Sequence, residues 1–379
     1  MKKKVMTRVL STMMAAVVTA GCMAGCGTDT ASNENENVVA DSNDSNEEAS
    51  VSDADVNTSS TGNYSDVITI VWYPNESADT YAEIRDEVAR LVTQATGKEV
   101  EQQLTTDYAI AIEALANGTA TIGCCWGAEG YIQAQNSNPA VHALLTNSGD
   151  SGTLDDAMYY SFLAVQEENA AEYADGSSYS IDNIQGKKMS FVSNSSTSGF
   201  KVPTNTIISK FSQTSDWADL TVDDLTEGGD DFFFSEVLFG GSHQGSAFNL
   251  LSGKCDIAAF CDTEINAYAS VVSGEETQVG SVYEINEGAD APFDTVVGEK
   301  FTVISSTPVM NGPFVYNSEV LSPEDAQAIV DLFTSDEVTN NELIFYPADG
   351  EKSGMYKQNG NNKFVAVEDA WYDPIRNMQ

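Results

Sequence analysis

The sequence predicts an α/β protein of two lobes, each a mostly parallel sheet flanked by helices, with a ligand cleft between the lobes. Apolar runs with the composition of buried strands alternate with amphipathic helical segments, which is the pattern of parallel sheets covered by helices. This alternation starts twice, near residue 67 and again near residue 160. About 315 residues are available for it, enough for one large or two medium domains.

The first lobe is expected to open with a β-rich run at 67–71. Apolar residues at helical spacing follow at 81–92, and a second strand is predicted at 99–105. The segment 107–117 is predicted to be a second helix, because it starts with an aspartate suited to capping and ends before a glycine. A nearly continuous apolar run at 120–126 completes the strand–helix alternation as a third strand.

The alternation resumes in the second half of the chain. Strands are predicted at 160–165, 189–193, 255–260 and 301–305. Helices are predicted from Ser198 or Pro203 to Phe211, at 244–251, and through Phe333 from the capping pattern at Ser322-Pro323. The chain is expected to cross between lobes near 159–165 and 301–306. The predicted domain limits are therefore 64–160 for the first lobe, 161–302 for the second, and 303–379 for a return to the first.

Charge and cysteine content exclude several classes of function. The net charge of −41 argues against binding nucleic acid or adhering to anionic lipid. It does not exclude a small anionic ligand, which responds mainly to nearby dipoles and hydrogen bonds because distant charges are screened. The body contains Cys124, Cys125, Cys255 and Cys261. They lack zinc-ligand spacing, so we interpret them as buried structural residues and expect neither a metal nor a cofactor.

The first 63 residues predict export and attachment to a membrane. A basic start and the short apolar run 9–20 form a signal peptide over 1–26, because the run is too short to span a bilayer. Small residues lead into a cysteine twice, and the pattern Met-Ala-Gly-Cys favours lipidation at Cys26, with Cys22 as the alternative. An ordinary signal peptide with incidental cysteines is the other interpretation.

The polar segment 27–63 is expected to be a disordered tether. Anchor and tether together predict a lipid-anchored protein on the extracytoplasmic face of a cell membrane, a plan common on Gram-positive surfaces.

Two short motifs predict an oxyanion site. In the segment 194–200, consecutive hydroxyls of Ser196, Thr197 and Ser198 lie between a strand and a helix, where free backbone N–H groups of a first helical turn also bind anions. A serine-rich surface loop is the alternative. The second motif ends at His243, again directly before a helix, where the helix dipole keeps the imidazole neutral but able to donate one N–H. Its alternative is a surface histidine.

Five motifs follow one another along the chain: Asp107-Tyr108, Tyr159-Tyr160-Ser161, Ser196-Thr197-Ser198-Gly199 with Pro203, Gly241-Ser242-His243, and Gly253-Lys254-Cys255-Asp256. Taken in this order, they resemble the phosphonate, phosphate and phosphite solute-binding proteins of ABC importers, which have the two-lobed type II periplasmic-binding-protein fold. The resemblance runs from about residue 67 to 333.

The resemblance implies a role for each of these side chains. Tyr108, Ser196, Thr197, Ser198 and His243 would hold the phosphonyl oxygens, and Tyr159, Asp262 and Glu264 would face the variable substituent. It also implies an ABC permease as partner and a monomeric protein that binds without catalysis.

One departure bears on the ligand. The segment 309–313 lacks the aspartate with which relatives contact an aminoalkyl group, and a lost charged hydrogen bond costs about 1.5–3 kcal/mol. This argues against 2-aminoethylphosphonate as the best ligand and leaves phosphate, phosphite, a simple alkylphosphonate or another small organic anion.

Two other functions fit parts of the sequence. A binding protein for a sulfonate or a vitamin precursor would share the fold and differ only in the cleft. A secreted serine-type hydrolase could use Ser196 or Ser198 with His243 and Asp262. Neither a Gly-x-Ser-x-Gly elbow nor a His-Glu-x-x-His helix is present in the sequence, which favours a binding protein over an enzyme.

Overall fold

The computed structural model describes residues 64–77, 79–347 and 354–378, which all fall within one compact unit. The predicted signal peptide, lipidation site and tether at 1–63 lie outside the described residues. Among the helices that are described, none has both the length and the apolar character needed to cross a membrane.

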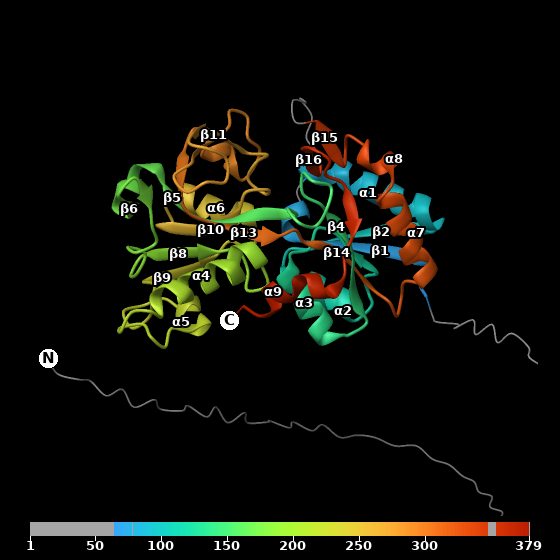
Figure 1. Cartoon of the computed structure of the whole chain (residues 1–379), viewed down its shortest axis with the longest axis horizontal. Helices are drawn as coiled ribbons and strands as arrows, with labels where there is room; N and C mark the ends of the chain where they lie inside the picture. The colour runs from blue at the N-terminus through green and yellow to red at the C-terminus, as the bar shows by residue number, and fades with distance from the viewer. Residues whose placement is uncertain (1–63, 78, 348–353, 379) are drawn as a thin grey trace, which may run out of the picture. The chain divides into compact units, whose positions relative to one another are not determined.

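The first sheet has six strands in the order β17-β4-β14-β3-β1-β2 (Figure 1). Its strands are β1 Val67–Trp72, β2 Glu99–Leu104, β3 Ile122–Gly123, β4 Val141–Asn147, β14 Pro313–Asn317 and β17 Phe364–Ala366. Alternate residues of β1 face opposite sides, as the pleat requires. Ile68, Ile70 and Trp72 pack with α1 (Ala82–Thr96) and α7 (Pro323–Phe333), whereas Val71 packs with α2 (Tyr108–Ala116) and α3 (Ala128–Ser137). This sheet and its helices are called the first lobe below.

The second sheet has seven strands in the order β11-β12-β13-β5-β10-β8-β9. Its strands are β5 Met158–Gln166, β8 Lys188–Phe191, β9 Glu236–Phe239, β10 Ile257–Cys261, β11 Ala269–Ser273, β12 Val282–Ile285 and β13 Lys300–Met310. Side chains of α4 (Val202–Phe211) and α5 (Val222–Thr226) pack on one face, and those of α6 (His243–Leu251) pack on the other. This sheet and its helices are called the second lobe.

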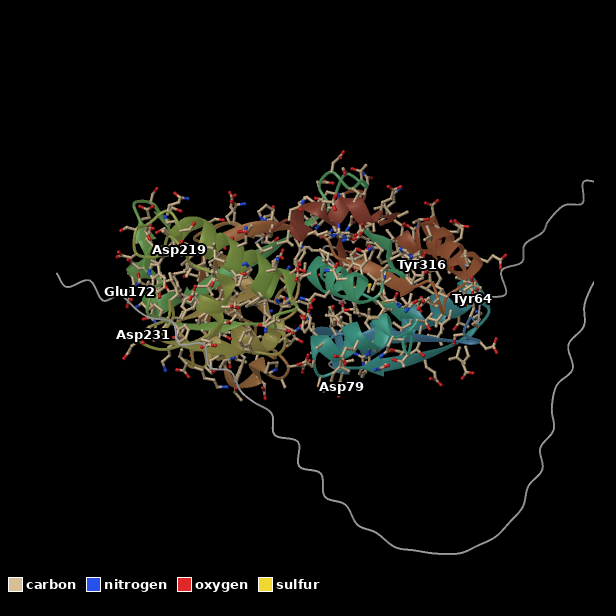
Figure 2. The ribbon with its side chains drawn as sticks, turned by 90° about the horizontal axis from the view of Figure 1, so that it is seen from below. Tyr64, Asp79, Glu172, Asp219, Asp231 and Tyr316 are labelled. Carbon is tan, nitrogen blue, oxygen red and sulfur yellow. The ribbon has the colours of Figure 1, made fainter. Side chains whose placement is uncertain are left out.

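Short elements complete the described chain. They are β6 Ala174–Asp175, β7 Ser178–Tyr179, β15 Phe345–Pro347, β16 Tyr356–Gln358, α8 Asp336–Thr339, α9 Asp373–Arg376, the 3-10 turns Pro74–Ser77, Asp79–Tyr81, Glu167–Tyr173, Phe293–Thr295 and Asp369–Tyr372, and the π-helical turn Thr197–Lys201. Many acidic residues lie on exposed loops: Figure 2 shows Glu172, Asp219 and Asp231 on the outside of the second lobe.

The two-lobed α/β fold is confirmed, but the prediction of mostly parallel sheets is wrong. In the first sheet only the β1–β2 and β1–β3 pairs are parallel, and in the second only the β10–β8 and β8–β9 pairs. The other neighbours are antiparallel. In the first sheet β14 and β17 are added after the chain returns from the second lobe, whereas β11, β12 and β13 of the second sheet are successive antiparallel strands. The strand predicted at 120–126 shrinks to Ile122–Gly123, since the backbone turns at Cys125, which has a φ of 58°.

The chain passes between the lobes along β5 and β13, which pair antiparallel from Gln166↔Phe301 to Met158↔Met310. Just beyond the ladder the N–H of Asn311 donates to the carbonyl of Ala157 at 3.0 Å, and β14 of the first sheet then begins at Pro313. The crossing between the lobes therefore lies at the end of the ladder formed by β5 and β13. The domain limits given from the sequence remain a prediction.

Candidate anion-binding site

One cavity of about 1170 Å³ is lined by residues of both lobes. It lies at the carboxyl ends of β1 and β8, the edge at which open α/β sheets bind ligands. The structure brings all eight residues predicted for the site to this cavity: Tyr108, Tyr159, Ser196, Thr197, Ser198, His243, Asp262 and Glu264. Each of these side chains makes contacts that limit the role it can play.

The three hydroxyl residues are buried at the start of a helix in the second lobe. Ser196 caps the π-helical turn Thr197–Lys201, and its hydroxyl accepts the N–H of Gly199 at 3.1 Å. Position 199 must be glycine, because a Cβ there would lie 2.2 Å from a methyl carbon of Val192. The first N–H groups of a helix have no acceptor within it, so the hydroxyls and the remaining N–H groups constitute a candidate neutral oxyanion site.

His243 is the first residue of α6 and is 4% exposed. Its Nδ1 accepts the backbone N–H of Cys261 at 3.0 Å, so the ring proton is on Nε2, which lies 3.4 Å from the Ser196 hydroxyl. Burial lowers the pKa of His243 to about 3, because a charged imidazolium would lose its hydration. His243 is therefore a neutral N–H donor. A general base needs the reverse tautomer, with the lone pair on Nε2.

Tyr108 provides a donor from the first lobe. Its hydroxyl accepts the side-chain N–H of Asn75 at 2.8 Å, which leaves the hydroxyl proton to donate elsewhere. The ring is fixed by stacking on Tyr73 at 4.2 Å between centroids, and Tyr73 stacks in turn on Trp126 at 4.7 Å. Asn75 was not predicted from the sequence; the only available signal was its place just after the carboxyl end of β1.

Acidic side chains also lie at or near the cavity. Asp262 is 7% exposed, and one of its oxygens accepts the backbone N–H of Tyr160 at 2.8 Å. Burial raises the pKa of Asp262 to about 6. The half-buried Glu264 accepts the side-chain N–H of Gln244 at 3.1 Å, and burial, assisted by the charge of Asp262, raises its pKa. Glu76, a further buried acid, has its pKa raised by burial and by Glu264. Gln244 and Glu76 were also missed.

Tyr159 lies on the cavity wall and belongs to β5. Burial raises the pKa of Tyr159, so its hydroxyl remains protonated. In the same strand the hydroxyl of Ser161 donates to the carbonyl of Ser198 at 2.7 Å, which ties β5 to the oxyanion site. Among the residues that the structure describes, no cluster of three or more His, Cys, Asp or Glu is placed to hold a metal ion.

The oxyanion residues also carry contacts between the lobes. The Thr197 hydroxyl accepts the N–H of Glu129 at 2.8 Å, and Glu129 lies in the first turn of α3. Beside it the Ser195 hydroxyl donates to the side chain of Gln133 at 2.7 Å. The donors that face the cavity are therefore held in place by the meeting of the two lobes.

Two lobes that meet around a cavity lined with buried neutral donors define a solute-binding protein for a small anion. The family described as the periplasmic substrate-binding protein of phosphonate ABC transporters matches residues 70–372, and the chain belongs to this family. It is a family of transport proteins rather than enzymes, and its members act outside the cytoplasm.

Individual relatives agree with this assignment. The phosphate-import protein PhnD of Mycolicibacterium smegmatis is 24% identical over 206 residues, which are 54% of this chain and 57% of that protein. The match thus spans little more than half the length of that relative.

Two solved structures share the fold. The binding-protein component of an ABC phosphonate transporter from Pseudomonas aeruginosa has a TM-score of 0.53 and 19% identity, over 82% of this chain and 85% of its own. PhnD1 of Prochlorococcus marinus, solved in complex with methylphosphonate, has a TM-score of 0.55 and 14% identity, over 83% and 97%.

Proposed function

We propose that this chain binds a phosphonate, phosphite or phosphate between its lobes and delivers it to an ABC permease. The observation that carries the proposal is the set of uncharged side chains with donor groups that line the cavity: Tyr108, Ser196, Thr197, Ser198 and His243. Preorganised hydroxyls and N–H groups can hold a phosphorus oxyanion without a cationic side chain. The substituent would face Tyr159, Asp262 and Glu264.

We further propose that binding takes place without chemistry. The Nε2 proton of His243 faces the Ser196 hydroxyl, so His243 cannot remove a proton from that serine as a hydrolase histidine would. The same proton suits an oxyanion acceptor. This favours binding over the hydrolase that the sequence also allowed.

The ligand can be identified by thermal melting of the soluble body, from about residue 59 onward. A ligand at about one hundred times its Kd adds about 2.7 kcal/mol to the free energy of unfolding, which raises Tm by a few degrees. We expect this rise with at least one of phosphate, phosphite, methylphosphonate, ethylphosphonate and 2-aminoethylphosphonate. Sulfate and methanesulfonate are the matched controls, because they present similar oxygens on a different central atom.

A rise with the sulfonate alone would replace the phosphonate proposal by the sulfonate alternative, and no rise with any compound would overturn both. Measuring the panel at about pH 5.5 and pH 8 adds a test of the substituent. Phosphates and phosphonates lose a second proton in the same range, so the change is compared with Glu264→Gln. Relative to this variant, wild type should lose affinity for an alkyl oxyanion and gain affinity for an aminoalkyl one as Glu264 ionises.

We also propose that the protein is a monomer on a lipid anchor at Cys26, on the outer face of a Gram-positive membrane, with 27–63 as tether. The proposal rests on the small-residue pattern before the cysteine. Cells expressing the full chain should incorporate radiolabelled palmitate into it, and Cys26→Ala should abolish the label. Cys22→Ala is the matched control and should keep the label. The reverse result would move the anchor to Cys22, and label in both variants would overturn the proposal.

The proposal that the protein is a monomer is tested separately: light scattering of the soluble body should give the mass of one chain.

A further inference from the structure

We propose that Asn75 is a positioning residue of the anion site, which joins the two lobes and directs the Tyr108 hydroxyl to the ligand. The inference rests on the proposed oxyanion function. Asn75 is 7% exposed and lies in the 3-10 turn that follows β1. The turn is held by the N–H of Glu76 donating to the carbonyl of Tyr73 at 3.2 Å, and by the Arg85 guanidinium donating to the carbonyl of Glu76.

Both ends of the Asn75 amide are occupied. Its N–H donates to the Tyr108 hydroxyl at 2.8 Å, within the first lobe. Its oxygen accepts the backbone N–H of His243 at 3.1 Å, from the second lobe. The amide therefore cannot rotate without losing one bond. Because the tyrosine oxygen accepts a hydrogen bond from the Asn75 amide, the hydroxyl proton of Tyr108 is left to point into the cavity.

The bond to His243 also completes the first turn of α6. Ser242 caps this helix by accepting the N–H of Gly245 at 3.0 Å, and Asn75 accepts the N–H of His243 from the other lobe. The arrangement is reciprocal, since Thr197 of the second lobe accepts an N–H of α3 in the first. Each lobe thus satisfies a helix N-terminus of the other. Separating the lobes breaks the bond between Asn75 and His243 and the bond between Thr197 and Glu129. The orientation of the Tyr108 hydroxyl therefore depends on the lobes being closed.

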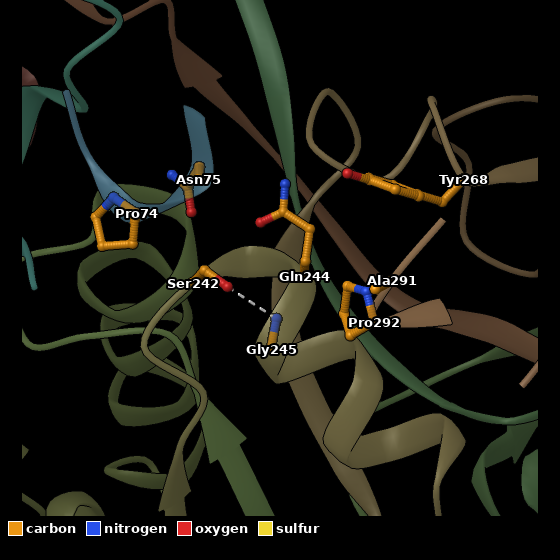
Figure 3. Close-up of a pocket in the computed structure, with 8 residues that line it drawn as sticks. All are labelled: Pro74, Asn75, Ser242, Gln244, Gly245, Tyr268, Ala291 and Pro292. Atoms are coloured by element: carbon orange, nitrogen blue, oxygen red, sulfur yellow. Dashed lines mark hydrogen bonds between the residues drawn. The ribbon is translucent and has the colours of Figure 1, made fainter. Parts of the chain in front are cut away.

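A second, smaller cavity of about 350 Å³ lies on the other side of Asn75. Figure 3 shows the side chain of Asn75 above the first turn of α6, with Ser242 and Gln244 across the cavity and Tyr268 at its far side. This space is large enough for several water molecules. Shortening Asn75 should therefore admit water rather than collapse the packing, which makes Asn75→Ala a clean test of its hydrogen bonds.

The test for the tyrosine is a double-mutant cycle with Asn75→Ala and Tyr108→Phe, using methylphosphonate and inorganic phosphate as calorimetric probes. We expect Asn75→Ala to weaken binding about ten-fold, the effect of roughly one hydrogen bond. The double variant should lose clearly less than the product of the two single losses, because Asn75 acts through Tyr108. Losses that multiply would overturn the positioning role.

The test for the lobe contact needs no ligand. Hydrogen exchange at the His243 amide should become several-fold faster in Asn75→Ala, while exchange at the Glu129 amide stays unchanged. Thr197→Val is the matched control and should give the opposite pair of results. Unchanged exchange at His243 would overturn the lobe contact. If wild type binds neither probe, the oxyanion function fails and with it the positioning role of Asn75, whereas the exchange result still decides the lobe contact.

Discussion

Replacing His243 by asparagine should weaken oxyanion binding by about ten- to one-hundred-fold while leaving the fold nearly as stable. The asparagine oxygen can occupy the position of Nδ1 and accept the N–H of Cys261, but nothing then replaces the N–H at Nε2. A hydrogen bond to a charged group contributes about 1.5–3 kcal/mol, and the site is buried, so water does not compensate. Calorimetric titration with the oxyanion that gives the largest melting shift measures the loss, and urea unfolding measures stability.

The control is His243→Gln, whose longer side chain places an amide N–H near the position of Nε2. It should retain more affinity than the asparagine variant and lose more stability, because Cys261 loses its acceptor. Equal affinity in wild type and the asparagine variant would mean that Nε2 does not contact the ligand. The pH dependence of binding near pH 6.5 should be the same in wild type and in His243→Gln, because the pKa of His243 is about 3 and any change in this range comes from other groups such as Glu264.

The contribution of Asp262 to the free energy of unfolding of the unliganded protein should fall as the pH rises from about 4 to about 7, whereas buried, neutral His243 contributes with the opposite sign. The pKa of Asp262 is raised by burial from 3.8 to about 6, so the native state holds more protons than the unfolded state over this range. The stabilisation is fully present below the unfolded pKa and is lost as the pH passes the native one. A shift of this size corresponds to on the order of 2–3 kcal/mol, and Glu264 adds an effect of the same sign.

Asp262→Asn isolates this effect, because the amide oxygen can still accept the N–H of Tyr160 while the titrating charge is removed. Urea unfolding at about pH 4.5, 6 and 8 should show that the stability of the variant relative to wild type increases with pH, because the contribution of His243 is common to both proteins. A difference that is the same at all three pH values would show that Asp262 titrates alike in the folded and unfolded states. Adding Glu264→Gln should make the difference from wild type increase further with pH.

Elements with local signals could be predicted from the sequence. The helix through Phe333 begins at Pro323 behind the Ser322 cap, and Asp107 caps α2, because capping depends on residues within one turn. Strand direction could not be predicted in this way. Whether β14 lies parallel or antiparallel to β3 depends on which lobe the chain has just left, roughly 190 residues further along the chain.

The residues of the candidate site also differ in whether a local sequence pattern marks them. The hydroxyl run at 196–198 and His243 belong to recognisable loop-to-helix motifs, so they could be found before the structure. Asn75 has no such pattern around it, and its partner His243 is 168 residues away. Tyr356 likewise reaches the cavity, 3.8 Å from the thiol of Cys125, across 231 residues. Contacts of this kind exist only once the lobes are assembled.

The ribbon of β5 and β13 sets the freedom with which the lobes can move. Its ladder extends to Met158↔Met310, so one strand cannot slide past the other without breaking several bonds at once. Near Met158 and Met310 the ladder consists of these two strands alone, so it can bend or twist there without breaking these bonds. We therefore expect a hinge near residues 157 and 311 that allows bending and twisting and resists sideways translation. As the hinge closes, an anion held by the second lobe meets Tyr108 and the end of α3.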